Sequence, residues 1–143
     1  MSRRAPAARH RARELLFRVV YQSDLTRDDV TAAWARAAEE ERLSDDQRQL
    51  VADVIGVLER RAADVDAEIR LAAERWTLER LAATDRSVLR AAVAELLGRP
   101  GTPVRVVLDE AIEIARRYGS EASGAFVNGV LDRIARRLRP GEL

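Results

Sequence analysis

The chain has 143 residues, a length that favours one domain with its own hydrophobic core. It has no cysteine and one histidine, which excludes disulfides and zinc–thiolate sites and leaves little for a metal cluster or a catalytic triad. The 25 basic residues, all of them Arg, nearly balance 24 acids, and no segment approaches the roughly 20 apolar residues that cross a bilayer. We therefore expect a cytoplasmic protein without membrane contact or cofactor.

The first half of the chain shows the apolar spacing of amphipathic helices. We expect a helix from Ala7 to Ser23, a second from Asp28 to Glu40, and a third that begins after Ser44. Ser44 is suited to N-cap this third helix, and Gln47 completes a capping box. The helical pattern runs on to Ala72, with a break expected near residues 61–64.

The second half predicts three more helices with short connections. A short link at Trp76–Leu81 precedes a helix capped by Thr84, and the segment Gly98–Gly101 breaks the pattern. Thr102 and Pro103 are a suitable cap and first-turn pair for the next helix. Gly119 suits a left-handed C-cap after it. Ser120 or Ser123 caps the last helix, which ends before Pro140.

These elements predict an all-α fold, a compact bundle of about seven helices in a single domain that spans residues 1–143. The break near residue 61 suggests two sub-bundles, at about residues 7–61 and 62–139. Residues 1–8 have no apolar stripe to hold them, so we expect a mobile basic arm there.

The residues that could support catalysis are few. Asp109, Glu110 and Glu113 lie within about one helical turn, and a solvated helix face explains them better than an acid–base pair. His10 lies in an Arg-rich segment that we expect to be exposed. The chain has no glycine-rich phosphate loop. We therefore expect no enzymatic activity.

The first turns of the first helix are strongly basic. Arg9, His10, Arg11 and Arg13 crowd this end, and their mutual repulsion would be relieved by a phosphate backbone. Arginines and aromatic rings follow one another at every fourth position from Arg9 to Tyr21, a combination that suits single-stranded RNA. Phe17 itself we expect to pack in the core, and an ordinary solvated terminus is the alternative for the arginines.

Three segments of the chain resemble the NusB family of bacterial transcription antitermination factors. They are RHRARELLFRVVYQSD at residues 9–24, DRSVLRAAVAELL at 85–97 and VVLDEAIEIARRYGSEASGAFVNGVLD at 106–132. The resemblance implies two stacked three-helix bundles and no catalysis. It also implies binding of boxA, a short single-stranded RNA element, together with NusE, a small-subunit ribosomal protein. Other Nus factors and RNA polymerase are the further partners implied.

The resemblance also implies roles for single residues. Ala122 and Ala125 stand where relatives can have polar or charged residues near the RNA, which leaves more of the contact to the N-terminal arginines. Tyr21 and Asp85 align with positions tied to the NusE partner. The positions implied for RNA binding are Arg9, His10, Arg11, Arg13, Arg90, Tyr118 and Phe126.

Two other functions remain open from the sequence. Similar helical domains occur fused to ribosomal RNA cytosine methyltransferases, so the chain could be an RNA-binding domain of that kind. A helical protein–protein interaction module without RNA is the second alternative, and unchanged partner binding after neutralisation of the N-terminal arginines would identify it. The sequence also leaves open whether the protein forms a homodimer.

Overall fold

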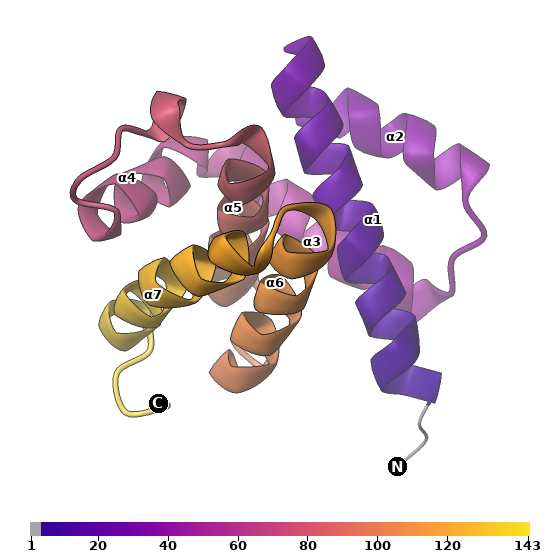
Figure 1. The fold of residues 1–143 in the computed structure, drawn as a ribbon. Helices are drawn as coiled ribbons and strands as arrows, with labels where there is room; N and C mark the ends of the chain where they lie inside the picture. The colour runs from indigo at the N-terminus through magenta and orange to yellow at the C-terminus, as the bar shows by residue number, and fades with distance from the viewer. Residues whose placement is uncertain (1–3) are drawn as a thin grey trace.

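The computed structural model describes residues 4–143, and every regular element in that range is a helix (Figure 1). This confirms the expected all-α fold. None of these helices is both long and apolar enough to cross a bilayer. The elements are α1 (Arg4–Thr26), α2 (Val30–Glu40), α3 (Asp45–Arg60), α4 (Ala62–Ala72), the short 3₁₀ helix η1 (Leu78–Arg80), α5 (Ala83–Gly98), α6 (Val104–Tyr118) and α7 (Glu121–Leu138).

Some helix ends follow the predicted capping and others do not. Ser44 and Gln47 form the expected capping box at the start of α3, and the Ser120 side chain accepts a hydrogen bond from the backbone of Ser123. Thr84 is not a cap, because α5 begins one residue before it, at Ala83, and has no side-chain cap. Pro103 precedes α6 as its N-cap residue and does not occupy the first turn.

The start of α1 differs from the expected mobile arm. Residues 4–8 already belong to the helix, and residues 1–3 of that arm lie outside the described part of the chain. The side-chain amide of Gln47 donates a hydrogen bond to the carbonyl of Ala8 at 2.9 Å. Arg9 also pairs with Asp46 at the start of α3. The first turns of α1 therefore gain tertiary support that its apolar pattern does not reveal.

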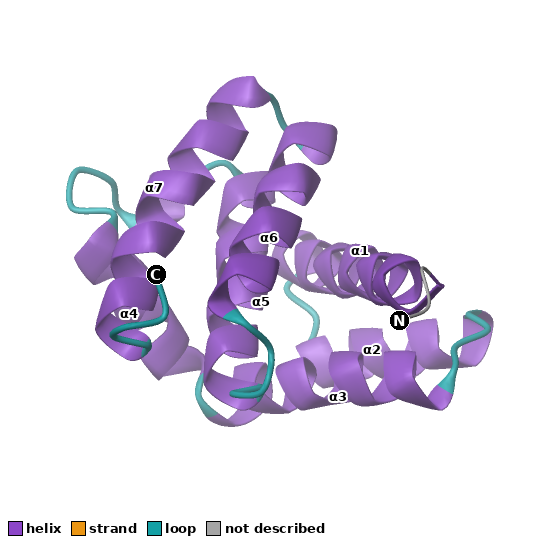
Figure 2. Ribbon diagram, turned by 90° about the horizontal axis from the view of Figure 1, so that it is seen from below, coloured by secondary structure: helices purple, strands orange, loops and turns teal. Residues whose placement is uncertain are grey.

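Helix α5 is the centre of the fold, and it contacts α1, α3, α4, α6 and α7 (Figures 1 and 2). Residues 87–89 and 91–96 are all buried, so α5 has no solvated face over these turns. Its small and aliphatic side chains allow helices to pack on every side. The buried apolar side chains form one continuous cluster that includes both expected sub-bundles, 7–61 and 62–139. These sub-bundles therefore share a single core.

Gly119 is required for a reason other than a left-handed conformation. Its φ is −114°, so the expected left-handed C-cap is wrong. A Cβ atom there would lie 2.8 Å from the carbonyl oxygen of Ala115 and 2.6 Å from the Oγ of Ser123. Glycine instead allows α6 and the start of α7 to meet in a tight turn.

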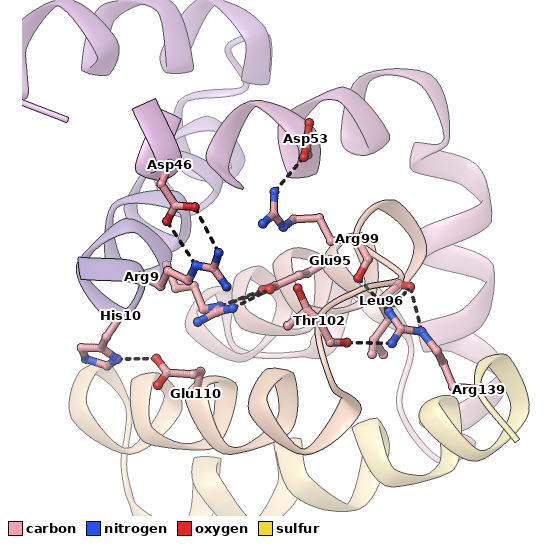
Figure 3. A network of polar contacts seen from close by, with 11 residues as sticks. Arg9, His10, Asp46, Asp53, Glu95, Leu96, Arg99, Thr102, Glu110 and Arg139 are labelled. Carbon is pink, nitrogen blue, oxygen red and sulfur yellow. Dashed lines mark hydrogen bonds and ion pairs between the residues drawn. The ribbon is translucent and has the colours of Figure 1, made fainter. Parts of the chain in front are cut away.

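The C-terminal end of α7 is fixed by Arg139. Its guanidinium donates hydrogen bonds to the backbone carbonyls of Leu96, Arg99 and Thr102, at 2.8 to 3.3 Å (Figure 3). The side chain is 9% exposed, so water competes little for these carbonyls. One side chain thus joins the end of α5, the α5–α6 loop and α7.

We predict that Arg139→Ala lowers the free energy of unfolding by about 2–3 kcal/mol, because three carbonyls lose a charged donor. Arg136→Ala is the matched control, since Arg136 is exposed and forms an ion pair with Asp132 on its own helix. It is expected to cost about 0.5 kcal/mol or less. Urea denaturation measures both changes, and equal losses would contradict the role of Arg139.

Candidate nucleic-acid interface

The basic end of α1 is largely neutralised by acids from other helices. Arg9 forms two hydrogen bonds with Asp46, which lies in the first turn of α3, at 3.0 and 3.1 Å (Figure 3). Both side chains are about half exposed, at 42% and 51%. Arg9 therefore stays within reach of solvent and of a ligand, although its charge is compensated.

His10 lies between carboxylates of two helices. Its Nδ1 is 2.5 Å from Glu110 on α6, and its Nε2 is 2.8 Å from Glu14 on α1. Glu113 lies farther away, at 3.9 Å from Nε2. Burial alone would lower the pKa of His10, but the hydrogen bond with Glu110 and the three carboxylate charges raise it above its ordinary value. Through these contacts the ring of His10 joins α1 to α6.

The same cluster has ligand types that metals use. One atom each from His10, Glu110 and Glu113 lies within 4.8 Å of the others. A histidine binds a metal ion through one ring nitrogen, and the other ligands must gather around the ion on that side of the ring. Here the carboxylates face both nitrogens of the ring, so an ion-paired histidine describes the geometry better than a metal site.

Arg13 points into the protein and not toward solvent. Its guanidinium makes three contacts with the carboxylate of Glu95 on α5, at 2.8, 3.0 and 3.2 Å. The two side chains are only 6% and 3% exposed. RNA can reach Arg13 only if this pair opens, so Arg13 does not belong to the accessible surface where the resemblance placed it.

The expected repulsion among the N-terminal basic residues is therefore wrong for this fold. Three of them, Arg9, His10 and Arg13, each face at least one acid from a distant part of the chain. Arg11 is exposed and makes no ion pair with the residues that the structure describes. Arg11 is thus the member of this group whose charge is directed to solvent without compensation.

An aromatic row lies beside the basic end. The Tyr118 ring packs on Phe17 with centroids 4.8 Å apart, and Phe17 stacks on Tyr21 at 5.7 Å. Phe17 is buried, as the core interpretation expected, whereas Tyr118 is 37% exposed. Phe126 on α7 is partly buried against the core. Tyr118 therefore offers an accessible aromatic surface near basic side chains.

A second polar site lies between α1, α4 and α5. It is an open groove of about 710 Å³ whose lining includes Asp24, Asp66, Arg86 and Arg90. Arg90 donates to Asp24 at 2.9 Å and to Asp66 at 2.9 and 3.2 Å. The structure thus places Arg90 in this groove, engaged by two acids. It does not join the basic end of α1.

The two residues expected to face a protein partner, Tyr21 and Asp85, are both partly buried. Tyr21 is partly buried through its contact with Phe17. Asp85 lies in the first turn of α5, next to Arg86, and one of its oxygens is buried without a hydrogen-bond partner among the described residues.

The acids that organise these sites were not identified from the sequence. Asp46 lies 37 positions from Arg9, Glu95 lies 82 from Arg13, and Glu110 lies 100 from His10. Glu110 and Glu113 were interpreted as a solvated helix face. Glu14 is the exception, because it lies four residues after His10 on the same helix, a spacing that predicts contact between the two side chains.

The fold and these surfaces define a small helical protein suited to binding through charged and aromatic side chains. Residues 10–136 match the NusB family, and the chain belongs to it. The transcription antitermination protein NusB of Koribacter versatilis is 40% identical over 134 residues, which cover 91% of this chain and 90% of that relative. The NusB of Anaeromyxobacter dehalogenans is 44% identical over 134 residues and 92% of this chain. Proteins of this family are antitermination factors and not enzymes.

Solved structures agree with the family. NusB of T. maritima has a TM-score of 0.84 and 37% identity, and the match covers 94% of each chain. A crystal structure of antitermination factors NusB and NusE in complex with dsRNA has a TM-score of 0.82 and 26% identity. That match covers 92% of this chain and 98% of the other.

We predict that Glu95→Ala lowers the free energy of unfolding by about 3–5 kcal/mol, because it leaves the Arg13 charge buried without a partner. The double variant Arg13→Met/Glu95→Leu removes both charges and is expected to recover most of this loss. Asp46→Ala, which removes an exposed partner, is the control and is expected to cost about 1 kcal/mol or less. A double variant less stable than Glu95→Ala would contradict this explanation.

The Asp24 carboxylate in the groove predicts that the free energy of unfolding depends on pH. Hydrogen bonds from Arg86, with the charges of Arg86 and Arg90, hold the pKa of Asp24 below its ordinary value, although burial opposes this. Asp24 therefore stabilises the fold above its ordinary pKa, and this contribution is lost as the pH falls through its lowered pKa. The stability difference between wild type and Asp24→Asn is expected to be largest near neutral pH and to shrink in acid.

Urea denaturation at a series of pH values tests this prediction. Asp28→Asn is the control, because Asp28 pairs with Arg36 at an exposed position. A difference between wild type and Asp24→Asn that stays constant from neutral to acid pH would show that the ionised Asp24 carboxylate does not stabilise the fold.

Proposed function

We propose that this protein acts in transcription antitermination by binding boxA-type single-stranded RNA jointly with NusE. Other Nus factors and RNA polymerase, in the cytoplasm, complete the proposed assembly. The observation that carries the proposal is the exposed Tyr118 at the end of α6, with the exposed guanidinium of Arg117 beside its ring. The similarity to a NusB that was crystallised with NusE and RNA supports it.

The proposed RNA face combines charge with an aromatic surface. Arg11 and Arg117 are exposed, and the Arg117 guanidinium carbon lies 5.7 Å from the centre of the Tyr118 ring. Phosphate contacts from the arginines supply affinity, whereas base contacts at Tyr118 and Phe126 supply sequence preference. Arg9 contributes after exchange of its Asp46 partner for a phosphate. Arg13 supports this face from within.

The proposed NusE face is the groove between α1, α4 and α5 with its surroundings. Asp24, Asp66 and Glu79 place carboxylates in its lining, which suits contact with a basic ribosomal protein, and Asp85 precedes the lining residue Arg86 on α5. Tyr21, a member of the aromatic row, lies on α1 within one turn of Ser23 and Asp24, which line the groove. Since α5 carries Arg86 and Arg90 at one end and Glu95 toward the other, both faces rest on the same helix. Joint binding of RNA and NusE is then cooperative in our proposal.

Fluorescence anisotropy of a labelled boxA RNA tests the proposal, with the protein alone and with NusE. A scrambled RNA of equal length is the control, and light scattering checks that the protein does not dimerise under these conditions. We expect boxA to bind more tightly than the scrambled RNA and NusE to strengthen this binding. Equal binding of both RNAs would contradict boxA recognition, and no binding even with NusE would favour a protein–protein interaction module.

Arg11→Ala is expected to weaken binding of both RNAs about threefold to tenfold and to reduce the salt slope by about 0.7, as one lost phosphate contact does for a single strand. Arg61→Ala is the matched control, because Arg61 is exposed at the far end of α3 and pairs with Asp64. Phe126→Ala is expected to reduce the preference for boxA over the scrambled RNA. An unchanged preference would exclude Phe126 from base recognition.

A further inference from the structure

Glu14 is a carboxylate on which three side chains converge. The Tyr118 hydroxyl donates to its Oε2 at 2.7 Å, and Arg117 donates to its Oε1 at 2.9 Å. The Nε2 of His10 lies 2.8 Å from the same Oε1. The Glu14 side chain is only 13% exposed, although two of the groups that it binds come from the end of α6. Glu14 therefore fastens the end of α6 to α1.

The contacts of Tyr118 fix its ring at two points. One part of the ring rests on Phe17, which is buried, and the hydroxyl is held by Glu14. The hydrogen bond with Glu14, then burial and the carboxylate charge, raise the pKa of the Tyr118 hydroxyl. Tyr118 as a whole nevertheless remains 37% exposed. An exposed ring with both of its torsions restrained is preorganised for a stacking ligand.

We propose that Glu14 is a positioning residue that holds the Tyr118 ring in the orientation in which a nucleobase of the RNA stacks on it. This inference rests on the proposed RNA-binding function. It adds a partly buried acid to a face that the sequence marks only by its basic and aromatic residues.

Because Glu14 is negatively charged, the direction in which its removal changes RNA affinity tests this role. An acid beside a phosphate-binding surface repels RNA. If Glu14 acted only through its charge, its removal would therefore strengthen RNA binding. Removal of a positioning contact weakens binding, because the ring is then mobile in the free protein and loses conformational entropy when the complex forms. Glu113 is a suitable comparison: it lies near His10 on α6, is 66% exposed and makes no contact with Tyr118.

The affinity for boxA RNA is measured by fluorescence anisotropy for the wild-type protein and for four variants: Glu14→Ala, Glu14→Gln, Tyr118→Phe and Glu113→Ala. Glu14→Ala and Tyr118→Phe are each expected to weaken binding about threefold to tenfold, the effect of one hydrogen bond. Glu14→Gln keeps one acceptor oxygen and is expected to restore most of the affinity. The double variant Glu14→Ala/Tyr118→Phe is expected to bind no more weakly than Glu14→Ala, because both changes remove the same hydrogen bond.

Glu113→Ala is expected to bind RNA as tightly as wild type or more tightly. If Glu14→Ala behaves in the same way, Glu14 acts only through its charge and the proposal is wrong. The hydrogen bond does not position the ring if Tyr118→Phe binds RNA as tightly as wild type. The same conclusion follows if the affinity losses of Glu14→Ala and Tyr118→Phe add in the double variant. Thermal denaturation of each variant confirms that it is folded at the temperature of the binding measurement.

An alkaline absorbance titration tests the contact without RNA. The chain has two tyrosines, so the ionisation of each contributes about half of the signal. In wild type one tyrosine is expected to ionise at higher pH than in Glu14→Ala, and identical titrations would overturn the contact. If wild type fails to prefer boxA while this shift is present, the proposed RNA function fails and the Glu14–Tyr118 contact stands.

Discussion

The buried ion pair between Arg13 and Glu95 is the constraint on which the arrangement of the molecule depends. It joins the first helix to the central one inside the apolar core, where an unpaired charge costs several kcal/mol. Because its geometry is bidentate, it fixes the rotation of α1 as well as its distance from α5. That rotation places Arg9 toward α3, His10 toward α6 and Arg11 toward solvent.

The face at the end of α1 follows from this orientation. Arg9 and His10 find acids on the two helices beside α1, so the local charge is much closer to balance than the N-terminal sequence suggests. An RNA that binds here must exchange some of these partners for phosphates. In the proposed function, a ligand that exchanges these ion pairs also stacks on Tyr118. The proposal therefore assigns specificity on this face to the ring as much as to the arginines.

Helix α5 connects this face with the charged groove on the other side of the core. Glu95 binds Arg13, and Arg90 and Arg86, five and nine residues before it on α5, bind Asp24 at the end of α1. The same two helices thus meet through ion pairs at both sites. A ligand that shifts α1 at one site changes the contacts at the other, which gives the proposed cooperation between RNA and NusE a physical route.

The sequence by itself determined the helices, the capping box at Ser44, the core position of Phe17 and, through three motifs, the family. These features depend on periodicity and local hydrogen bonds, which neighbouring residues contain. Only the tertiary structure decided that Arg13 is buried, that Arg90 lies in the groove, and that Glu14 joins His10 to Tyr118. Such roles depend on partners as many as 104 positions away, and an arginine has the same local pattern whether a phosphate or a buried glutamate neutralises it.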